Sequence, residues 1–388
     1  MAALHIYDPR ERALVTAGDA VLRGFATLAR PFRHRVRTDR PRRILLLRLE
    51  RIGDLLMALP ALGDLRAHVP GAELDLVVGS WNAEVARNIP GISQVHVVDA
   101  PWLAREGSAV RTTSMVKAAI GWRRLHYDVA VNLEPDVRSN LLIALSGARW
   151  TAGYRSAGGG PLLDQAIEYH PAEHTVDNAR RLVSEVFGAT PAQATRLLAV
   201  PDASRREADA LLAGRARPLV AVHASGGRPV KQWPTERFAA VARRLVDSHA
   251  ATIVLTGGPG DSALVGVMKG ALPPDRVVDA SGAASLLTVA AILERCELMI
   301  TGDTGPMHLA AAVGTPIVAV FGPSDPRRYA PRGPLDRVIR VDLACAPCNR
   351  IRLPPERCTG HAPDCLAFIP PDRVFEAAAS ILAVRRVA

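Results

Sequence analysis

Residues 43–62 read RILLLRLERIGDLLMALPAL. The stretch opens with an almost continuous apolar run, RILLLRL, which is typical of a β-strand buried on both faces of a parallel sheet. Gly53 and Asp54 then open a helical stretch, because glycine permits a tight turn and a carboxylate stabilises the N-terminus of a helix. The segment therefore predicts one strand-to-helix unit of an α/β fold.

Apolar runs of similar length recur along the chain, and amphipathic stretches such as residues 235–250 and 285–296 separate most of them. Strands that alternate with helices predict parallel sheets connected by right-handed crossovers. A polar, proline-flanked segment at residues 199–218 interrupts the series. We therefore expect two Rossmann-like halves joined near residues 190–217. The remaining runs lie at residues 72–79, 93–100, 127–134, 217–226, 251–258, 276–282, 297–303 and 315–322.

The bulk properties of the chain exclude several classes of protein. Its 388 residues suggest two or three domains, and 48% hydrophobic with 22% charged residues allows a sizeable core. No apolar run approaches the roughly 18 residues of a membrane span, and the N-terminus lacks the order of a signal peptide, so we expect a cytoplasmic protein. The formal net charge of +10 favours acidic partners. Only 4% of residues are aromatic and no basic stripe alternates with stacking rings, so we expect no nucleic acid partner.

Residues 1–41 form an N-terminal extension with its own pattern. Asp8 and Pro9 resemble a helix start, apolar residues then recur at helical spacing, and a basic tract runs from Arg30 to Arg43. Two interpretations stay open: a helix lying on an anionic membrane surface, and a helix packed on the protein body and followed by a solvated linker. The apolar positions are Leu14, Ala17, Val21, Phe25 and Leu28.

One strand end in the C-terminal half carries a turn of the kind that binds phosphate. Residues 302–308 read GDTGPMH directly after an apolar run. Ligands of open parallel sheets bind beyond the carboxyl ends of the strands, small residues admit a ligand to the main chain, and N–H groups at a helix start suit a phosphate. We therefore expect Asp303, Thr304, Gly305 and His308 to surround a bound phosphate or its sugar.

Two more strand ends in the same half follow this logic. Ser225 lies in a loop of small residues, and Lys231 precedes a helix, so its compact ammonium is a natural partner for a diphosphate. Asp261, in the loop at residues 256–262, is placed to accept hydrogen bonds from a ribose. Each signal is weak alone, but three such loops in one half predict a nucleotide site.

Several familiar site motifs are absent from the sequence. No Asp-x-Asp pair stands at a strand end to hold a divalent ion, and there is no Walker lysine loop, Gly-x-Ser-x-Gly elbow or Gly-x-Gly-x-x-Gly fingerprint. These absences disfavour kinases, hydrolases and dinucleotide enzymes. The charge of a diphosphate would then be met by Lys231 and helix N-termini.

Four cysteines cluster in a short, proline-rich segment that follows the last expected strand. One Cys-x-x-Cys pair is followed by two isolated thiols. Two interpretations stay open: thiolates that hold a structural zinc or iron ion, and thiols that are unligated or form a redox-labile pair. In either case we expect the segment to brace the fold, not to catalyse. The cysteines are Cys345, Cys348, Cys358 and Cys365.

At this point the sequence resembles glycosyltransferase family 9, the ADP-heptose:lipopolysaccharide heptosyltransferases. The resemblance covers about residues 42–385, and Asp-Thr-Gly-Pro-Met-His at 303–308 is its most specific part. It implies an α/β, GT-B architecture of two Rossmann-like, doubly wound domains facing across a cleft. It also implies inverting glycosyl transfer that needs no metal or other cofactor. The segments that carry it are residues 43–62, 127–154, 223–242 and 281–326.

The resemblance implies roles for single residues. Asp54, at the matching Gly-Asp of the first loop, would be the general base, although the residues alone also allow a simple helix cap. Glu50 and Arg51 stand on the acceptor side, where small hydroxyl residues often precede this Gly-Asp in the family. The implied donor contacts are Ser225, Lys231, Thr304 and Gly305 at the diphosphate, Asp261 at the ribose, and Asp303 and His308 along the donor pocket.

We therefore expect a glycosyltransferase that moves heptose from ADP-heptose to a lipid A-linked core oligosaccharide, at or near the cytoplasmic face of the inner membrane. Arg48, Arg51 and Arg138 are candidate contacts to this anionic acceptor. Two alternatives are the same fold with another nucleotide-sugar donor or a protein or other glycan as acceptor, and a non-catalytic protein that binds sugar nucleotides. The expected parts are the extension at 1–41, an acceptor domain at 42–195, a donor domain at 196–370 that includes the cysteine-rich segment 345–365, and a C-terminal helix at 371–388.

Overall fold

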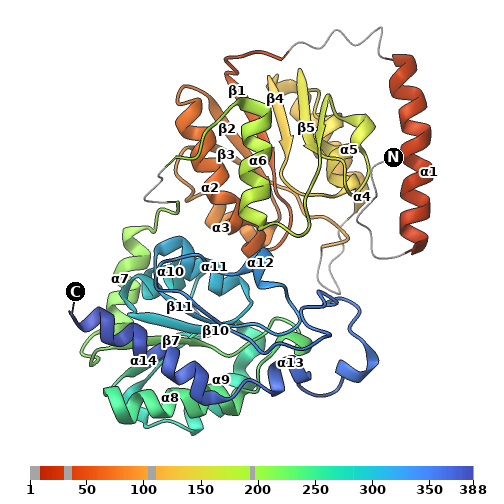
Figure 1. Ribbon diagram of the computed structural model, residues 1–388. Helices are drawn as coiled ribbons and strands as arrows, with labels where there is room; N and C mark the ends of the chain where they lie inside the picture. The colour runs from red at the N-terminus through yellow and green to blue at the C-terminus, as the bar shows by residue number, and fades with distance from the viewer. Residues whose placement is uncertain (1–8, 30–36, 104–110, 193–196, 283, 388) are drawn as a thin grey trace. The chain divides into compact units, whose positions relative to one another are not determined.

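The chain forms two compact units, Met1–Leu197 and Leu198–Ala388 (Figure 1). Each unit is built on a six-stranded sheet in which every pair of neighbouring strands is parallel. The structure is a computed structural model that describes residues 9–29, 37–103, 111–192, 197–282 and 284–387.

The sheet of the first unit has the strand order β3-β2-β1-β4-β5-β6. Strand β1 lies in its interior, and all four residues from Ile44 to Leu47 are fully buried, so helices cover both faces as the continuous apolar run predicts. The strands are β1 Arg43–Leu47, β2 Glu73–Val78, β3 Ile92–Val97, β4 Val129–Asn132, β5 Trp150–Tyr154 and β6 Gln165–Ile167.

The helices of this unit pack in pairs on the sheet: α2 packs against α6, and α4 against α5. The side chains of Leu45 and Leu47 join one buried cluster with Met115 of α4 and Leu142 of α5. Alternate residues of a strand point to opposite faces, so this cluster fills one side of the sheet. The helices are α1 Pro9–Ala29, α2 Ile52–His68, α3 Ala83–Ala86, α4 Thr112–Gly121, α5 Val137–Leu145 and α6 Thr175–Phe187.

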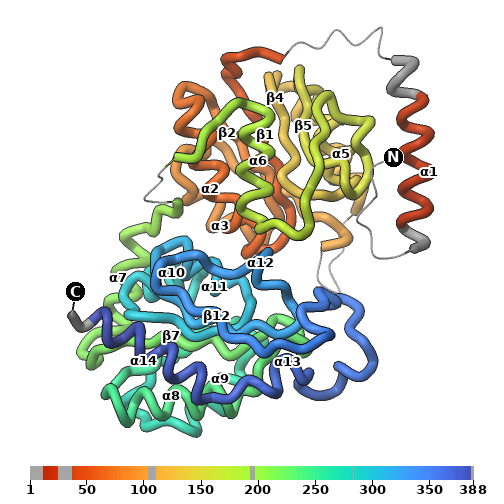
Figure 2. The backbone as a smooth tube through the Cα atoms, viewed as in Figure 1, coloured from red at the N-terminus to blue at the C-terminus, as the bar shows by residue number. Residues whose placement is uncertain are grey.

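The sheet of the second unit repeats this topology, with the order β12-β11-β10-β7-β8-β9. Numbered within each unit, both orders are 3-2-1-4-5-6, the order of a doubly wound dinucleotide-binding fold. The edge strand β12 is labelled in Figure 2. The strands are β7 Leu219–His223, β8 Thr252–Leu255, β9 Val277–Asp279, β10 Leu298–Gly302, β11 Ile317–Val320 and β12 Arg337–Ile339.

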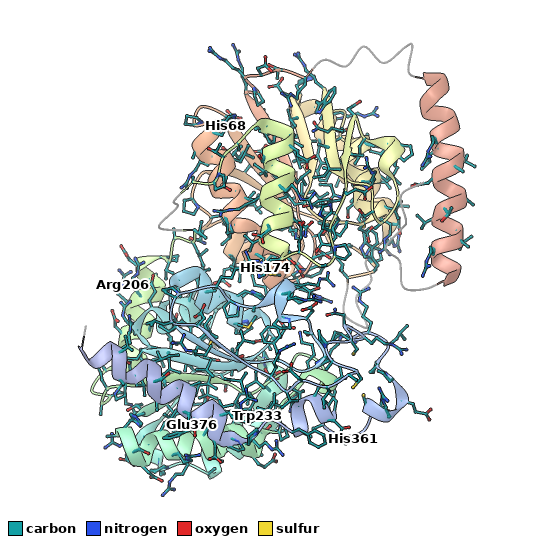
Figure 3. All side chains as sticks on the ribbon, viewed as in Figure 1. His68, His174, Arg206, Trp233, His361 and Glu376 are labelled. Carbon is teal, nitrogen blue, oxygen red and sulfur yellow. The ribbon has the colours of Figure 1, made fainter. Side chains whose placement is uncertain are left out.

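The core of the second unit includes one large cluster on the side of α8, α9 and α14. Trp233, labelled in Figure 3, is 1% exposed, stacks edge-on against Phe238, and donates from Nε1 to the carbonyl of Ile369 at 3.3 Å. These contacts tie the segment before α8 to the segment before the C-terminal helix. The helices are α7 Asp202–Leu212, α8 Thr235–His249, α9 Ser262–Gly270, α10 Leu286–Arg295, α11 Gly305–Val313, α12 Pro326–Tyr329, α13 Asp364–Ala367 and α14 Pro371–Val387.

The expected α/β class is confirmed, and each apolar run predicted as a strand overlaps one. The sequence analysis missed β5, β6 and β12, because strands of three to five residues at or beside a sheet edge carry few apolar positions. It also missed α7 within the polar segment 199–218. Only Ala208 and Leu212 of α7 are buried, one turn apart, where the helix packs on α10.

The N-terminal helix α1 contacts the rest of the first unit through Asp19 and not through Leu14 or Val21, and the side chains of Phe25 and Leu28 lie outside the described residues. Asp19 is buried, and its Oδ1 accepts the N–H of Gly159 at 2.7 Å. The apolar positions Leu14 and Val21 are instead 74% and 59% exposed. The predicted start at Asp8 and the basic residues up to Arg35 lie outside the described residues. Among the helices that the structure describes, none is both long and apolar enough to cross a membrane.

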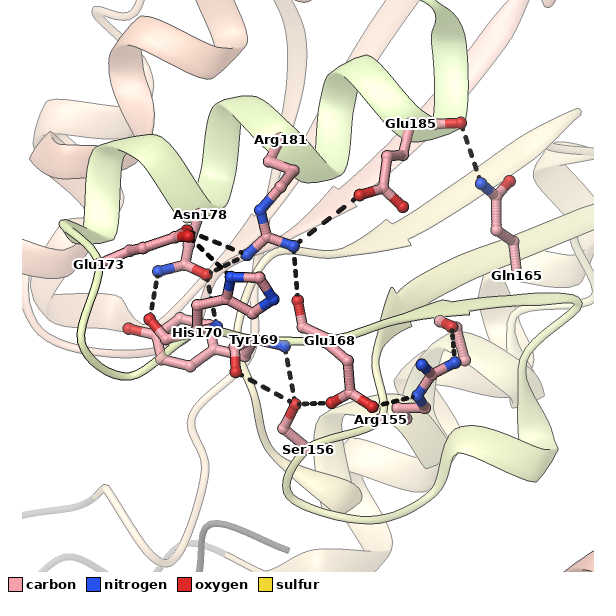
Figure 4. A network of polar contacts seen from close by, with 11 residues as sticks. Arg155, Ser156, Gln165, Glu168, Tyr169, His170, Glu173, Asn178, Arg181 and Glu185 are labelled. Carbon is pink, nitrogen blue, oxygen red and sulfur yellow. Dashed lines mark hydrogen bonds and ion pairs between the residues drawn. The ribbon is translucent and has the colours of Figure 1, made fainter. Parts of the chain in front are cut away.

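A polar network connects the segment between β6 and α6 to its surroundings (Figure 4). The hydroxyl of Ser156 donates to Glu168 Oε2 at 2.9 Å and accepts the N–H of Tyr169 at 2.7 Å. From α6, Arg181 donates to the carbonyl of Glu168 at 2.8 Å and to Asn178 Oδ1 at 2.6 Å. The network fixes the position of Tyr169, whose ring lies edge-on against Tyr154 of β5.

Candidate functional site

The first unit has one topological switch point, between β1 and β4. The chain proceeds from β1 to β2 on one side and later continues with β4 on the other side. In open parallel sheets, ligands bind at the carboxyl ends of the strands at such a point. The segments that leave β1 and β4 there are residues 48–54 and 133–136. Asp54 ends the first of them, in the first turn of α2, with its side chain 30% exposed.

Arg48 is enclosed at this switch point. It is 3% exposed, and its Nη2 lies 3.0 Å from Glu50 Oε2 and 3.6 Å from Asp54 Oδ1. Its Nη1 donates to the carbonyl of Leu133. Burial alone would lower the pKa of Arg48, but attraction to Glu50, Asp54 and Glu134 raises the pKa above its ordinary value. The predicted acceptor contact Arg48 therefore faces protein carboxylates and not solvent.

Glu134, directly after β4, is the second buried charge at this edge and was missed by the sequence analysis. It is 1% exposed, and its Oε2 accepts the N–H groups of Leu49 at 3.0 Å and Glu50 at 3.2 Å. Its Oε1 accepts from the hydroxyl of Ser139. Burial raises the pKa of Glu134 to about 7, against the opposing attraction of Arg48 and the hydrogen bond from Ser139. Its place at the end of an apolar run, at the same edge as Asp54, was the signal that could have found it.

Glu50 completes a set of carboxylates around one guanidinium. Its pKa is raised above the ordinary value, first by desolvation and then by repulsion from Asp54 and Glu134, although Arg48 opposes this. Its carbonyl accepts from Trp81 Nε1 at 2.9 Å, so the main chain beside it is held as well. Several carboxylates thus surround the single guanidinium of Arg48, and burial together with their mutual repulsion raises the pKa of Glu50 and of Glu134.

The other two arginines expected at the acceptor stack on tryptophan rings. The guanidinium of Arg51 lies 5.0 Å from the ring centroid of Trp81, and that of Arg138 lies 4.2 Å from that of Trp102. Asp136, the N-cap residue of α5, also pairs with Arg138. Stacking restricts each planar guanidinium to one orientation while leaving its charge in place.

The second unit has the equivalent switch point, between β7 and β10. Lys231 Nζ, after β7, lies 2.7 Å from Asp303 Oδ2, after β10, and both side chains are largely buried. Burial alone would raise the pKa of Asp303. Attraction to Lys231 and His308, with hydrogen bonds from Lys231 and Ser324, outweighs burial and lowers the pKa below its ordinary range. The structure therefore brings together three of the residues expected at the donor.

Helix α11 begins beside this ion pair. Thr304 is its N-cap residue, but in the described part of the chain its hydroxyl caps no N–H of the first turn and lies 3.2 Å from Thr301 Oγ1. Gly305 and Pro306 follow, and His308 is 8% exposed. A helix start left uncapped by side chains is suited to an anion, because its N–H groups and dipole both favour negative charge.

The remaining predicted donor residues meet at the ends of β7 and β8. Ser225 and Asp261 line the same small cavity. Asp261 Oδ2 accepts the N–H of Gly258 at 2.7 Å, which shapes its own loop. His223, which the sequence analysis did not select, lies buried close by, with Nδ1 3.1 Å from the carbonyl of Thr256. Desolvation lowers the pKa of His223, so it is neutral at pH 7.

The four cysteines of the 345–365 segment are free thiols of unequal exposure. Burial, and then the neighbouring thiols of Cys348, Cys358 and Cys345, raise the pKa of Cys365 to about 11. His361, labelled in Figure 3, is exposed. Nevertheless, the described residues contain no group of three or more His, Cys, Asp or Glu side chains arranged to hold a metal ion. The predicted zinc or iron site gains no support from this arrangement.

Comparison with known proteins identifies the family. The model of glycosyltransferase family 9 (heptosyltransferase) matches residues 117–357. The lipopolysaccharide core heptosyltransferase OpsX of Haemophilus influenzae is 24% identical over 313 residues, which cover 78% of this chain and 86% of OpsX.

Solved structures agree with this match. A family 9 glycosyl transferase from Veillonella parvula has a TM-score of 0.76 and 25% identity, covering 88% of this chain and 97% of that one. The Escherichia coli heptosyltransferase WaaC, solved with ADP, shares the fold with a TM-score of 0.68 and 22% identity, covering 87% and 99%. The family model spans more than half of the chain, which therefore belongs to glycosyltransferase family 9 and is a glycosyltransferase with the GT-B architecture.

Proposed function

We propose that this enzyme transfers heptose from ADP-heptose to the inner core of lipopolysaccharide, with inversion at the anomeric carbon. The observation that carries the proposal is the pair of Lys231 and Asp303 beside the start of α11. A compact positive charge and a helix N-terminus together suit a diphosphate. The relatives support the donor and the acceptor class, since WaaC was solved with ADP and OpsX acts on the lipopolysaccharide core.

Asp54 is the proposed general base. A sugar hydroxyl is a poor nucleophile at neutral pH and needs a base within hydrogen-bond reach. Asp54 is partly exposed at the carboxyl edge of the first sheet, where it can meet an acceptor hydroxyl. Asp54 takes the proton as the hydroxyl oxygen attacks the anomeric carbon. Because the attack comes from the side opposite the departing ADP, it inverts the configuration at that carbon.

Lys231 and the start of α11 are the proposed stabilisers of the leaving group. Negative charge grows on the diphosphate as the bond to the sugar breaks, and fixed positive groups aimed at that charge lower the barrier. In the structure Asp303 holds Lys231 in place; a bound diphosphate would take over this partner and leave the Asp303 carboxylate to accept from donor hydroxyls. Thr304, Gly305 and His308 line the same turn. Ser225 would contact the diphosphate, and Asp261 the ribose.

The two units divide the work in this proposal. The first unit binds the acceptor and supplies Asp54, and the second unit binds the nucleotide-sugar. Arg51 and Arg138, each stacked on a tryptophan, are the proposed contacts to the anionic core of a lipid A-linked acceptor. Arg48 contributes indirectly, because it pairs with Asp54.

We further propose that transfer needs no metal ion. Lys231 and the N-terminus of α11 would neutralise the charge of the diphosphate. They would replace the metal cation that other transferases bind at a pair of carboxylates. A structural zinc or iron ion at the four cysteines stays a prediction, which metal analysis of the purified protein by mass spectrometry tests.

Helix α1 is the proposed contact with the membrane surface. Leu14 and Val21, two turns apart, both project from its exposed side. Sedimentation with vesicles of anionic lipid should recover the wild-type protein, and serine at both positions should reduce recovery. Serine at Leu211, an exposed leucine of α7, is the matched control. Equal recovery of the α1 variant and the control would contradict this contact.

The transfer reaction is tested by incubating the protein with a lipid A-linked core acceptor and one nucleotide-sugar at a time. We expect mass spectrometry to detect an acceptor heavier by one heptose residue with ADP-heptose, together with released ADP. Transfer only from another nucleotide-sugar would retain the fold and mechanism but replace the donor. Tight binding of nucleotide-sugars without transfer to any acceptor would favour a non-catalytic binding protein.

A further inference from the structure

The carboxylate of Glu134 joins the two segments that leave the first unit's switch point. It belongs to the segment after β4, yet its Oε2 accepts two consecutive main-chain N–H groups, of Leu49 and Glu50, from the segment after β1. Its other oxygen accepts from Ser139, in the first turn of α5. With an exposed fraction of 1%, the side chain is enclosed by the protein and is not a surface for substrate.

The segment held in this way leads directly to Asp54. On the other side of the same main chain, the carbonyl of Glu50 accepts from Trp81 Nε1 at 2.9 Å and from Asn82 Nδ2 at 2.7 Å. The loop is therefore held from the β4 side through its N–H groups and from the β2 side through a carbonyl. A loop whose main chain is anchored at two places is already ordered. Little conformational entropy is therefore lost when Asp54 adopts the one orientation that catalysis needs.

Glu134 also shares a cation with Asp54. Arg48 lies 3.6 Å from Asp54 and 3.0 Å from Glu50, and its charge is attracted to Glu134 as well. Arg48 therefore gives the Asp54 side chain a charged partner within the group that Glu134 anchors.

We propose that Glu134 is a positioning residue for Asp54, because its carboxylate anchors the loop that carries Asp54. The inference rests on the proposed function of Asp54 as the general base. An anchored loop aims the Asp54 carboxylate at the acceptor hydroxyl.

Several titratable and charged groups of the first unit surround Arg48 and Glu134. Burial raises the pKa of Glu134 to about 7. The titratable and charged groups that face Arg48 or Glu134 are Glu50 and Asp54 from the segment after β1, Asp136 from the segment after β4, Tyr154 of β5, and Tyr169 after β6.

The variant Glu134→Gln weakens the anchor, because a neutral amide oxygen is a poorer acceptor for the two N–H groups than a carboxylate oxygen, and the amide nitrogen cannot accept from Ser139. We expect kcat to fall about tenfold with the KM for the donor unchanged, as for a small misplacement of a catalytic group. Glu134→Ala, which removes the anchor entirely, should lower kcat further.

Glu168→Gln is the matched control. Glu168 is a glutamate of the same unit that also accepts from a serine, but its carboxylate is held by Arg155 and Ser156, which follow β5 and lie outside the loop before α2 (Figure 4). It should leave kcat and the KM for the donor unchanged. If Glu134→Gln does not fold, as judged by circular dichroism, Ser139→Ala takes its place. Removal of this one donor to Glu134 should then lower kcat about threefold, a fraction of the effect of misplacing the group.

Asp54→Asn is measured in parallel and separates the two claims. If Asp54→Asn keeps near-normal turnover, the role of Asp54 as base is wrong. If Asp54→Asn is inactive while Glu134→Gln, or Ser139→Ala in its place, keeps wild-type kcat, the inference about Glu134 alone is overturned. An inactive Asp54→Asn with a tenfold slower Glu134→Gln whose KM for the donor is unchanged supports both.

Discussion

Replacement of Lys231 by alanine tests the donor site most sharply. Lys231 Nζ lies 2.7 Å from Asp303 Oδ2, and the two side chains are only 18% and 11% exposed. The proposed diphosphate would bind the same ammonium, which would then exchange one anionic partner for another. The substitution should therefore weaken ligands that carry a diphosphate and leave ligands that lack one nearly unaffected.

The magnitude follows from the strength of the hydrogen bond between the ammonium and the diphosphate. A hydrogen bond to a charged group contributes about 1.5–3 kcal/mol, so the affinity for ADP should fall roughly 10- to 150-fold. Adenosine, which has no phosphate, should lose less than about threefold, within the scatter of a surface substitution. The free protein should also lose stability, by about 3 kcal/mol, because Asp303 is left buried without its cation.

Lys269→Ala is the matched control in the same unit. Lys269 pairs with Asp279 at 2.9 Å, but the side chains are 51% and 32% exposed. An exposed pair contributes about 0–1 kcal/mol, so the control should change neither ligand affinity by a measurable factor. Titration calorimetry with ADP and adenosine, and thermal unfolding of both variants, measure these effects. Equal losses for ADP and adenosine, or equal effects of the two variants, would refute the role of Lys231.

Three more predictions concern the first unit and the chemistry. Asp54→Asn should abolish transfer while calorimetry still shows ADP binding; near-normal turnover would remove Asp54 as the base. The folded state raises the pKa of Glu134 from 4.5 to about 7, so it binds that proton more tightly than the unfolded chain. Stability should therefore decline by up to about 3 kcal/mol as pH rises from 4.5 through 7, and denaturant unfolding should show a smaller decline for Glu134→Gln; equal declines would contradict this. Incubation with EDTA should leave transfer rates unchanged, with unfolding monitored to detect loss of a structural ion; an immediate loss that Mg²⁺ restores would contradict metal-independent transfer.

Much of the fold could be predicted because its strands are continuous apolar runs between amphipathic helices. The run at 43–49 is an example: β1 is buried on both faces, so every position is apolar except where the strand ends. Strands β6 and β12 escaped prediction because three residues at a sheet edge leave no pattern to detect. Helix α7 was not predicted because only Ala208 and Leu212 are buried in it, among charged neighbours.

The candidate site was predictable only where a residue type is unusual for its place. Lys231, one of few lysines, and the run of small residues around Thr304 stood out, and the structure pairs Lys231 with Asp303. The buried residues that hold the site in place have no such unusual feature in the sequence. Glu134 looks like the polar end of a strand, and only its bonds to two N–H groups of another loop show that it is enclosed. Arg48 was predicted to contact the acceptor. The sequence does not show that Glu50, Asp54 and Glu134 surround its guanidinium.

The measurement that tests the central claim most directly is titration calorimetry of the purified protein with ADP, UDP, GDP, CMP and NAD, with ADP-heptose included. ADP and ADP-heptose should bind tightest, and Lys231→Ala should weaken both. Tighter binding of UDP or GDP, or binding of none of these ligands, would contradict ADP-heptose as the donor.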